Sequence, residues 1–164
     1  MDNKPTKVIL HHTADSSQGN QFEKVNEWHK HRFSMQSSLG IYIGYHYFIE
    51  RNGKIIKCRQ EDEEGAHTKG QNFESVGICL AGNFDFEAPT EAQRYALQVI
   101  LGELAVKLNV YEVDLKYHWD FSDTHCPGFW FKNEEWQKLI ENYKMTFYLR
   151  LISWLKIILG KKRE

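Results

Sequence analysis

Two residues of types that bind zinc, a histidine and a cysteine, lie eight positions apart in the last third of the sequence. They are His118 and Cys126, and the dipeptide Pro127-Gly128 follows the cysteine directly. Imidazole nitrogen and thiolate sulfur are common zinc ligands, and two of them on one loop lack only a third from elsewhere in the chain. Three protein ligands leave one coordination position open, which distinguishes a catalytic zinc site from a structural one. This stretch therefore predicts part of a catalytic zinc site.

The candidates for the third ligand are two adjacent histidines near the start of the chain. The apolar run Val8 to Leu10 ends on His11 and His12, a pattern that is typical of a buried strand. Neighbouring side chains of a strand point to opposite faces, so only one of the two histidines can easily reach a metal on one face. The residues alone leave the choice between His11 and His12 open.

The elements that must position these residues alternate between strands and helices. Apolar periodicity predicts strands at 7–12, 44–50, 54–58, 75–81 and 113–117, and helices at 21–31, at 91–108 and from 134 onward. The sequence Asn52-Gly53 between two apolar segments predicts a hairpin turn. Asn20, Thr90 and Asn133 precede the helices as N-caps.

This order of elements predicts an α/β fold in a single domain. A hairpin together with helical crossovers implies a mixed central β-sheet, flanked on both faces by about three helices. The spacing in the helix at 91–108 predicts that its core-facing residues are Tyr95, Val99, Ile100 and Leu104.

Composition narrows the class of protein. The chain has 164 residues, of which 41% are hydrophobic, and this suffices for one domain with a core. The formal net charge is −1, which argues against a nucleic-acid binder. The three cysteines predict no disulfide framework, and Cys58 and Cys79 lie in apolar segments where buried thiols are expected. The first residues contain no apolar signal segment, so we expect synthesis in the cytoplasm without a cleavable signal peptide.

The C-terminal tail has a different composition. Residues 144–164 hold six Lys or Arg against one acidic residue, Glu164, a net charge of +5. Their spacing predicts a basic amphipathic C-terminal helix, which is too short and too charged to span a bilayer. Two interpretations stand: the helix packs on the domain or on a second copy, or it contacts an anionic membrane or lipopolysaccharide.

Five motifs along the chain carry a resemblance to a known family. In order, they are the segments 8–14, 44–49, 65–68, 75–78 together with 82–84, and 118–128. Together they resemble the zinc-dependent N-acetylmuramoyl-L-alanine amidases of the type-2 amidase and peptidoglycan-recognition-protein superfamily, to which the phage amidases called lysozymes belong. The resemblance covers about residues 5–143. It implies one amidase domain at 1–143, followed by the separate helix at 144–164.

The resemblance also implies roles for particular residues. One Zn²⁺ per chain is expected on His11, His118 and Cys126, so the family pattern selects His11 over His12. The family's catalytic tyrosine corresponds to Tyr45. Thr124 stands at a catalytic position where phage members often carry lysine, so a cationic clamp on the transition state is absent. The substrate-binding positions correspond to His67, Asn72 and Asn83.

The activity implied by the resemblance is zinc-dependent hydrolysis of the amide bond between N-acetylmuramic acid and L-alanine. The partner is bacterial peptidoglycan, and the role is that of an endolysin acting at the cell wall during phage or prophage lysis. A different class of function, a non-catalytic peptidoglycan-binding module, is the alternative. The sequence leaves the stem-peptide type and the oligomeric state open.

Overall fold

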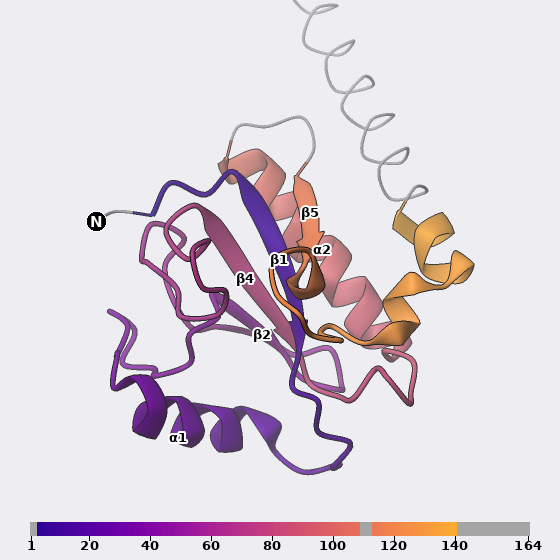
Figure 1. Ribbon diagram of the computed structural model, residues 1–164, viewed down its shortest axis with the longest axis horizontal. Coiled ribbons are helices and arrows are strands. Elements are labelled where there is room, and N and C mark those ends of the chain that lie inside the picture. The colour runs from indigo at the N-terminus through magenta and orange to yellow at the C-terminus, as the bar shows by residue number, and fades with distance from the viewer. Residues whose placement is uncertain (1–2, 109–112, 141–164) are drawn as a thin grey trace, which may run out of the picture. The chain divides into compact units, whose positions relative to one another are not determined.

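The computed structural model of the protein describes residues 3–108 and 113–140 (Figure 1). Within them a five-stranded sheet has the strand order β3-β2-β4-β1-β5. In chain order the strands are β1 (Lys7–His12), β2 (Tyr47–Ile49), β3 (Ile55–Lys57), β4 (Ser75–Leu80) and β5 (Asp114–Tyr117). The predicted helix at 144–164 lies outside the described residues.

The sheet is mixed, as predicted. β1 lies between β4 and β5 and pairs with both in parallel, and β2 pairs with β4 in parallel. β3 alone is antiparallel, because it forms a hairpin with β2. The turn of that hairpin uses Gly53 at a φ of 82°, a conformation that glycine adopts without steric cost, so the Asn-Gly turn is confirmed.

Helices α1 (Gln21–Phe33) and α2 (Glu91–Lys107) cover opposite faces of the sheet. The contacts of β2 show this, since its consecutive residues Tyr47 and Phe48 point to opposite faces. The ring of Phe48 packs on Phe22 of α1, with 5.8 Å between centroids, and the Tyr47 hydroxyl lies 3.4 Å from Lys107 Nζ of α2. The predicted α/β architecture with helices on both faces is therefore confirmed.

The start of α2 is held by Gln93, a polar residue that is completely buried. Thr90 and Gln93 form the predicted capping box, and Gln93 Nε2 also donates to the carbonyl oxygens of Ala81 (2.8 Å) and Ile49 (3.4 Å). These bonds fix which face of α2 is buried. The buried face contains Ile100 and Leu104. The prediction that Tyr95 faces the core is wrong, because its side chain is 69% exposed. Ile100 and Leu104 are buried as predicted, but the first buried residue of the helix is Gln93 rather than Tyr95.

Contacts divide the chain into two compact units, Met1–Phe131 and Lys132–Glu164. The first contains the sheet, both long helices and the short 3₁₀ helix η1 (His118–Asp120). A second 3₁₀ helix, η2 (Phe129–Lys132), ends at the boundary. In the second unit a helix begins at Glu134, and Asn133 caps it by accepting the N–H of Trp136 at 2.8 Å. Among the described residues, no helix has the length and apolar composition needed to cross a bilayer.

Two buried histidines act as acceptors for backbone N–H groups in the core. Nδ1 of His29 accepts from Gly44 at 2.7 Å, and Nδ1 of His46 accepts from Gly77 at 3.0 Å. Both side chains are almost fully buried. Burial lowers the pKa of each histidine to about 4, because the charged imidazolium is poorly solvated there. Protonation would also remove the acceptor, so both rings are neutral in the folded protein at neutral pH.

We predict that the folded state loses stability as the pH falls from 6.5 towards 4. The unfolded chain binds protons on these histidines at a pKa near 6.5, whereas the folded chain does so at about 4. The stabilisation is therefore complete above pH 6.5 and is lost with acidification, by roughly 2 kcal/mol for each histidine by about pH 5.

Urea denaturation at about pH 7 and about pH 5 measures this loss. His29→Gln provides the matched control, because its amide oxygen still accepts the N–H of Gly44 but does not titrate. We expect a smaller loss on acidification in His29→Gln than in the unmodified protein. An equal loss in both proteins would contradict the assignment to His29.

Candidate active site

The site lies at the C-terminal ends of the parallel strands β1 and β5. The register pairs Leu10 with Tyr117, so His11 near the end of β1 lies beside His118, the residue that follows β5. The two imidazole centroids are 4.6 Å apart. The carboxyl ends of parallel strands are where α/β folds commonly place their ligand sites.

Cys126 lies at the end of the loop 118–126, whose two ends are joined by a backbone hydrogen bond. The N–H of Trp119 donates to the carbonyl of Cys126 at 3.0 Å, which ties the two ends of the loop together. Cys126 Sγ lies 3.7 Å from His11 Nδ1, and the ligand atoms of His11, His118 and Cys126 all lie within 4.8 Å of one another. Two ligand atoms of a tetrahedral zinc ion are expected at roughly 3.5 Å from each other. The three residues thus form a group that fits a metal ion.

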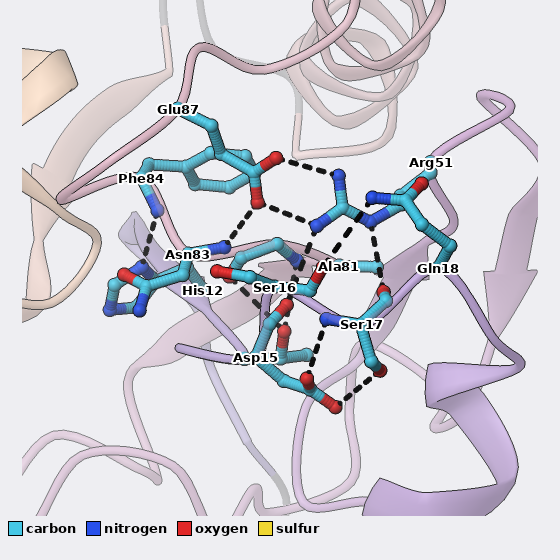
Figure 2. A network of polar contacts seen from close by, with 12 residues as sticks. His12, Asp15, Ser16, Ser17, Gln18, Arg51, Ala81, Asn83, Phe84 and Glu87 are labelled. Carbon is cyan, nitrogen blue, oxygen red and sulfur yellow. Dashed lines mark hydrogen bonds and ion pairs between the residues drawn. The ribbon is translucent and has the colours of Figure 1, made fainter.

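The two adjacent histidines have different surroundings in the structure. His11 lies in one group with Cys126 and His118. The ring of His12 instead accepts the N–H of Phe84 through its Nδ1, at 3.2 Å (Figure 2). His12 still touches the site through its backbone, because its N–H donates to Cys126 Sγ at 3.4 Å. The grouping of His11 with His118 and Cys126 therefore favours His11 over His12 as the candidate ligand.

The pKa shifts of His11, His118 and Cys126 favour binding of a cation between them. Burial, and then the neighbouring His67 and His118, lower the pKa of His11 well below its usual value, and burial also lowers that of His118. Neutral imidazole is the form that binds metal. Burial raises the pKa of the Cys126 thiol to about 12, so its thiolate is disfavoured without a nearby positive charge. A bound metal ion supplies that charge.

Tyr45 and Thr124, the two predicted catalytic residues, both lie next to the three candidate ligands. The ring of Tyr45, which precedes β2, is 5.0 Å from the ring of His11. Burial raises the pKa of Tyr45 well above its usual value, so the hydroxyl keeps its proton and can donate it in a hydrogen bond. Thr124 Oγ1 accepts the N–H of Cys126 at 3.2 Å and so supports the loop that carries the thiol.

The predicted substrate-binding residues all take part in bonds within the protein. Asn72 Oδ1 accepts the N–H groups of His67 (2.9 Å) and Thr68 (2.8 Å), and Asn83 Oδ1 accepts the N–H of Asp85 at 3.3 Å. His67 and Thr68 both contact His11, with distances from His11 Nε2 of 3.1 Å to His67 Nδ1 and 3.3 Å to Thr68 Oγ1. Thr68 is a functional candidate that the predicted site lacked, and its position next to His67 in the motif at 65–68 is its signal in the sequence.

The guanidinium of Arg51 forms hydrogen bonds with the loops that follow β1 and β4 (Figure 2). It forms two hydrogen bonds with the carboxylate of Glu87, at 2.9 and 2.5 Å, and its Nε donates to the carbonyl of Ser17 at 3.3 Å. Glu87 in turn accepts the N–H of Asn83 at 2.9 Å. One side chain therefore connects the loop after β1 with the loop after β4.

The comparisons with known proteins agree with this geometry. Residues 1–129 match the family model described as N-acetylmuramoyl-L-alanine amidase. The endolysin of Klebsiella phage KP32 is 35% identical over 68% of this chain and 75% of its own length. The endolysin of Escherichia phage T7 is 33% identical over 77% of this chain and 86% of its own length. The solved structure of the amidase LysC from Clostridium intestinale superposes with a TM-score of 0.71 and 33% identity, covering 85% of this chain and 87% of that chain.

A group of residues that could hold a metal ion, at the carboxyl ends of parallel strands, first defines the class, an α/β protein with a candidate metal site. The family match then makes the assignment specific: the chain belongs to the N-acetylmuramoyl-L-alanine amidase family. Its activity is that of a peptidoglycan amidase.

We predict that Arg51→Met lowers the free energy of unfolding by roughly 1–2 kcal/mol, because methionine keeps the aliphatic stem but loses the charged hydrogen bonds. Lys24→Met is the matched control. It removes a cation that also contacts the loop after β1, but in the exposed pair with Asp15, and we expect a change below about 0.5 kcal/mol. Urea denaturation measures both variants, and equal effects would refute the special role of Arg51.

Proposed function

We propose that this chain hydrolyses the amide bond between N-acetylmuramic acid and L-alanine with one Zn²⁺ held by His11, His118 and Cys126. The observation that carries the proposal is the convergence of these three side chains, with His11 Nδ1 3.7 Å from Cys126 Sγ, in a member of the amidase family. Two imidazoles and a thiolate are a donor set typical of zinc, and three protein ligands leave one position free.

A zinc ion held by His11, His118 and Cys126 would supply Lewis acidity, which would polarise the scissile carbonyl and lower the pKa of bound water to about 7. The protein prepares the site in two ways. Burial keeps His11 and His118 neutral, in the form that binds metal. The backbone N–H of His12 donates to Cys126 Sγ, which favours the thiolate.

Tyr45 supplies a protonated hydroxyl on a ring whose centroid lies 5.0 Å from that of His11. In the proposed reaction this hydroxyl donates a hydrogen bond to the oxyanion that develops on the scissile carbonyl. Donors in such positions act mainly on the transition state, where the negative charge is largest. Thr124, at the position where related phage enzymes often carry lysine, adds no positive charge, so this chain relies on neutral donors.

We further propose that the enzyme works as an endolysin at the bacterial cell wall, as the names of its phage relatives suggest. Asn72 and Asn83 stay predicted substrate-binding residues, with their side-chain oxygens engaged by backbone N–H groups. Contact of residues 144–164 with an anionic membrane or lipopolysaccharide stays a prediction from their net charge of +5. The complete ligand set disfavours the alternative of a non-catalytic peptidoglycan-binding module.

We predict that Cys126→Ser removes bound zinc and amidase activity together while the chain still folds, because a serine hydroxyl is a far weaker zinc ligand than a thiolate. Elemental analysis of the purified protein and mass spectrometry of a peptidoglycan digest measure the two losses. Cys58→Ala is the control, since it removes a buried thiol outside the site. Retention of both zinc and full activity by Cys126→Ser would show that the ligand assignment is wrong.

We predict that Tyr45→Phe keeps zinc and fold but lowers kcat by roughly 10²–10³, the usual effect of removing one oxyanion donor. The rate at which free stem peptides beginning with L-alanine appear in the digest measures this. The substitution removes only the hydroxyl, so packing around the ring is preserved. An unchanged kcat would exclude the proposed role of Tyr45.

A further inference from the structure

The edge of the His11 ring opposite Cys126 is held by a compact polar triangle. His11 Nε2 lies 3.1 Å from His67 Nδ1 and 3.3 Å from Thr68 Oγ1, and these two atoms are themselves 3.1 Å apart. Thr68 is buried, at 1% exposure, so its hydroxyl exchanges no hydrogen bonds with bulk water. Every ring atom of His11 that can form a hydrogen bond is thus directed either at Cys126 or at this triangle.

One arrangement of protons satisfies the three atoms of this triangle, His11 Nε2, Thr68 Oγ1 and His67 Nδ1. When Nδ1 of His11 binds a cation, the proton of the neutral ring must reside on Nε2. That N–H donates to Thr68 Oγ1, and the Thr68 hydroxyl donates to His67 Nδ1. The arrangement fixes the His11 tautomer that presents a free lone pair at Nδ1, on the side of Cys126.

The position of His67 is enforced by the backbone around it. A Cβ at Gly77 would lie 2.6 Å from His67 Cδ2, and a Cβ at Gly65 would lie 2.5 Å from the same atom. Only glycine at these two positions makes room for the imidazole. From the other direction, Asn72 Oδ1 holds the backbone N–H groups of His67 and Thr68. Sheet, loop and ring are therefore packed so that His67 stays against His11.

This position has an energetic disadvantage. Among the described residues, His67 Nε2 is buried without a hydrogen-bond partner. A buried polar atom without a partner typically costs about 1–3 kcal/mol of stability, so an unpaired group of this kind calls for an explanation other than folding. Its ring partner His11 is a candidate metal ligand, and this suggests that the explanation is support of the metal site.

We propose that His67 and Thr68 are positioning residues that hold His11 in the orientation and tautomer required for metal binding, and that they thereby set the affinity for zinc. The inference rests on the proposed zinc site. It gives His67 a role different from the substrate-binding one expected from the sequence. Groups that orient a metal ligand typically contribute 10–100-fold to metal affinity.

The test is the zinc affinity of the full chain, measured by competition with a chromogenic chelator. We expect Thr68→Val to weaken zinc binding by roughly 10–100-fold, because valine keeps the shape of threonine but cannot accept from His11. Thr68→Ser keeps the hydroxyl and should restore the affinity. Thr90→Val is the matched control: it removes the cap of α2 and lowers stability, but it leaves zinc affinity unchanged.

His67→Phe provides the second variant, since phenylalanine fills the space above Gly77 without an acceptor. We expect weaker zinc binding in this variant too. Unchanged zinc affinity together with a raised KM for peptidoglycan fragments would show that His67 binds substrate, and it would overturn the proposal. Unchanged zinc affinity in both Thr68→Val and His67→Phe, with zinc bound to the unmodified chain, would overturn this inference alone. An unmodified chain that binds no zinc would overturn the proposed function as well.

Discussion

The parallel pairing of β1 with β5 is the constraint on which the site depends. His11 and His118 come from opposite ends of the described chain, and the register Leu10↔Tyr117 alone makes them neighbours. A slip of one residue would exchange the two faces of β1 and present His12 in place of His11. The bonds of the flanking residues oppose such a slip, since the ring of His12 accepts the N–H of Phe84 and its own N–H is bonded to Cys126 Sγ.

Burial of the candidate ligands also changes their pKa values. Desolvation keeps the two candidate histidine ligands neutral and raises the pKa of the thiol of Cys126. Neutral imidazoles favour binding of a cation, whereas an isolated thiol at this position resists ionisation. A metal ion held there would remove that conflict, because its charge would stabilise the thiolate more strongly in a poorly solvated site than in water.

Hydrogen bonds between side chains and backbone support the loops that carry the site residues. Asn72 holds the backbone of His67, and Thr124 holds the backbone of Cys126. Arg51 and Glu87 join two loops by a charged pair that is mostly shielded from solvent. The loops have little regular structure of their own, so these contacts provide the rigidity that a strand or helix would otherwise give.

The sequence by itself determined the elements, the hairpin, the helix caps and the chemical types of the ligands. Each of these depends on residues close together in the chain, such as Asn52-Gly53 or Thr90 with Gln93, and local physics decides them. The motifs and their order also indicated the family. The family pattern predicted the group of His11, His118 and Cys126. For these residues to form a site, the segments 8–14 and 118–128 must meet at one edge of the sheet.

Only the tertiary structure decided which face each residue takes. The buried stripe of α2 follows Gln93 and its bonds to two strands, so Tyr95 faces solvent although its spacing fits a core position. The contact of Thr68 with His11 could not be predicted, because a threonine in a polar loop indicates by itself no partner, and its place beside His67 in the motif says nothing of His11. Likewise, the sequence does not indicate that Gly65 and Gly77 make room for the His67 ring. These features depend on contacts between segments far apart in the chain, and neither periodicity nor local spacing encodes them.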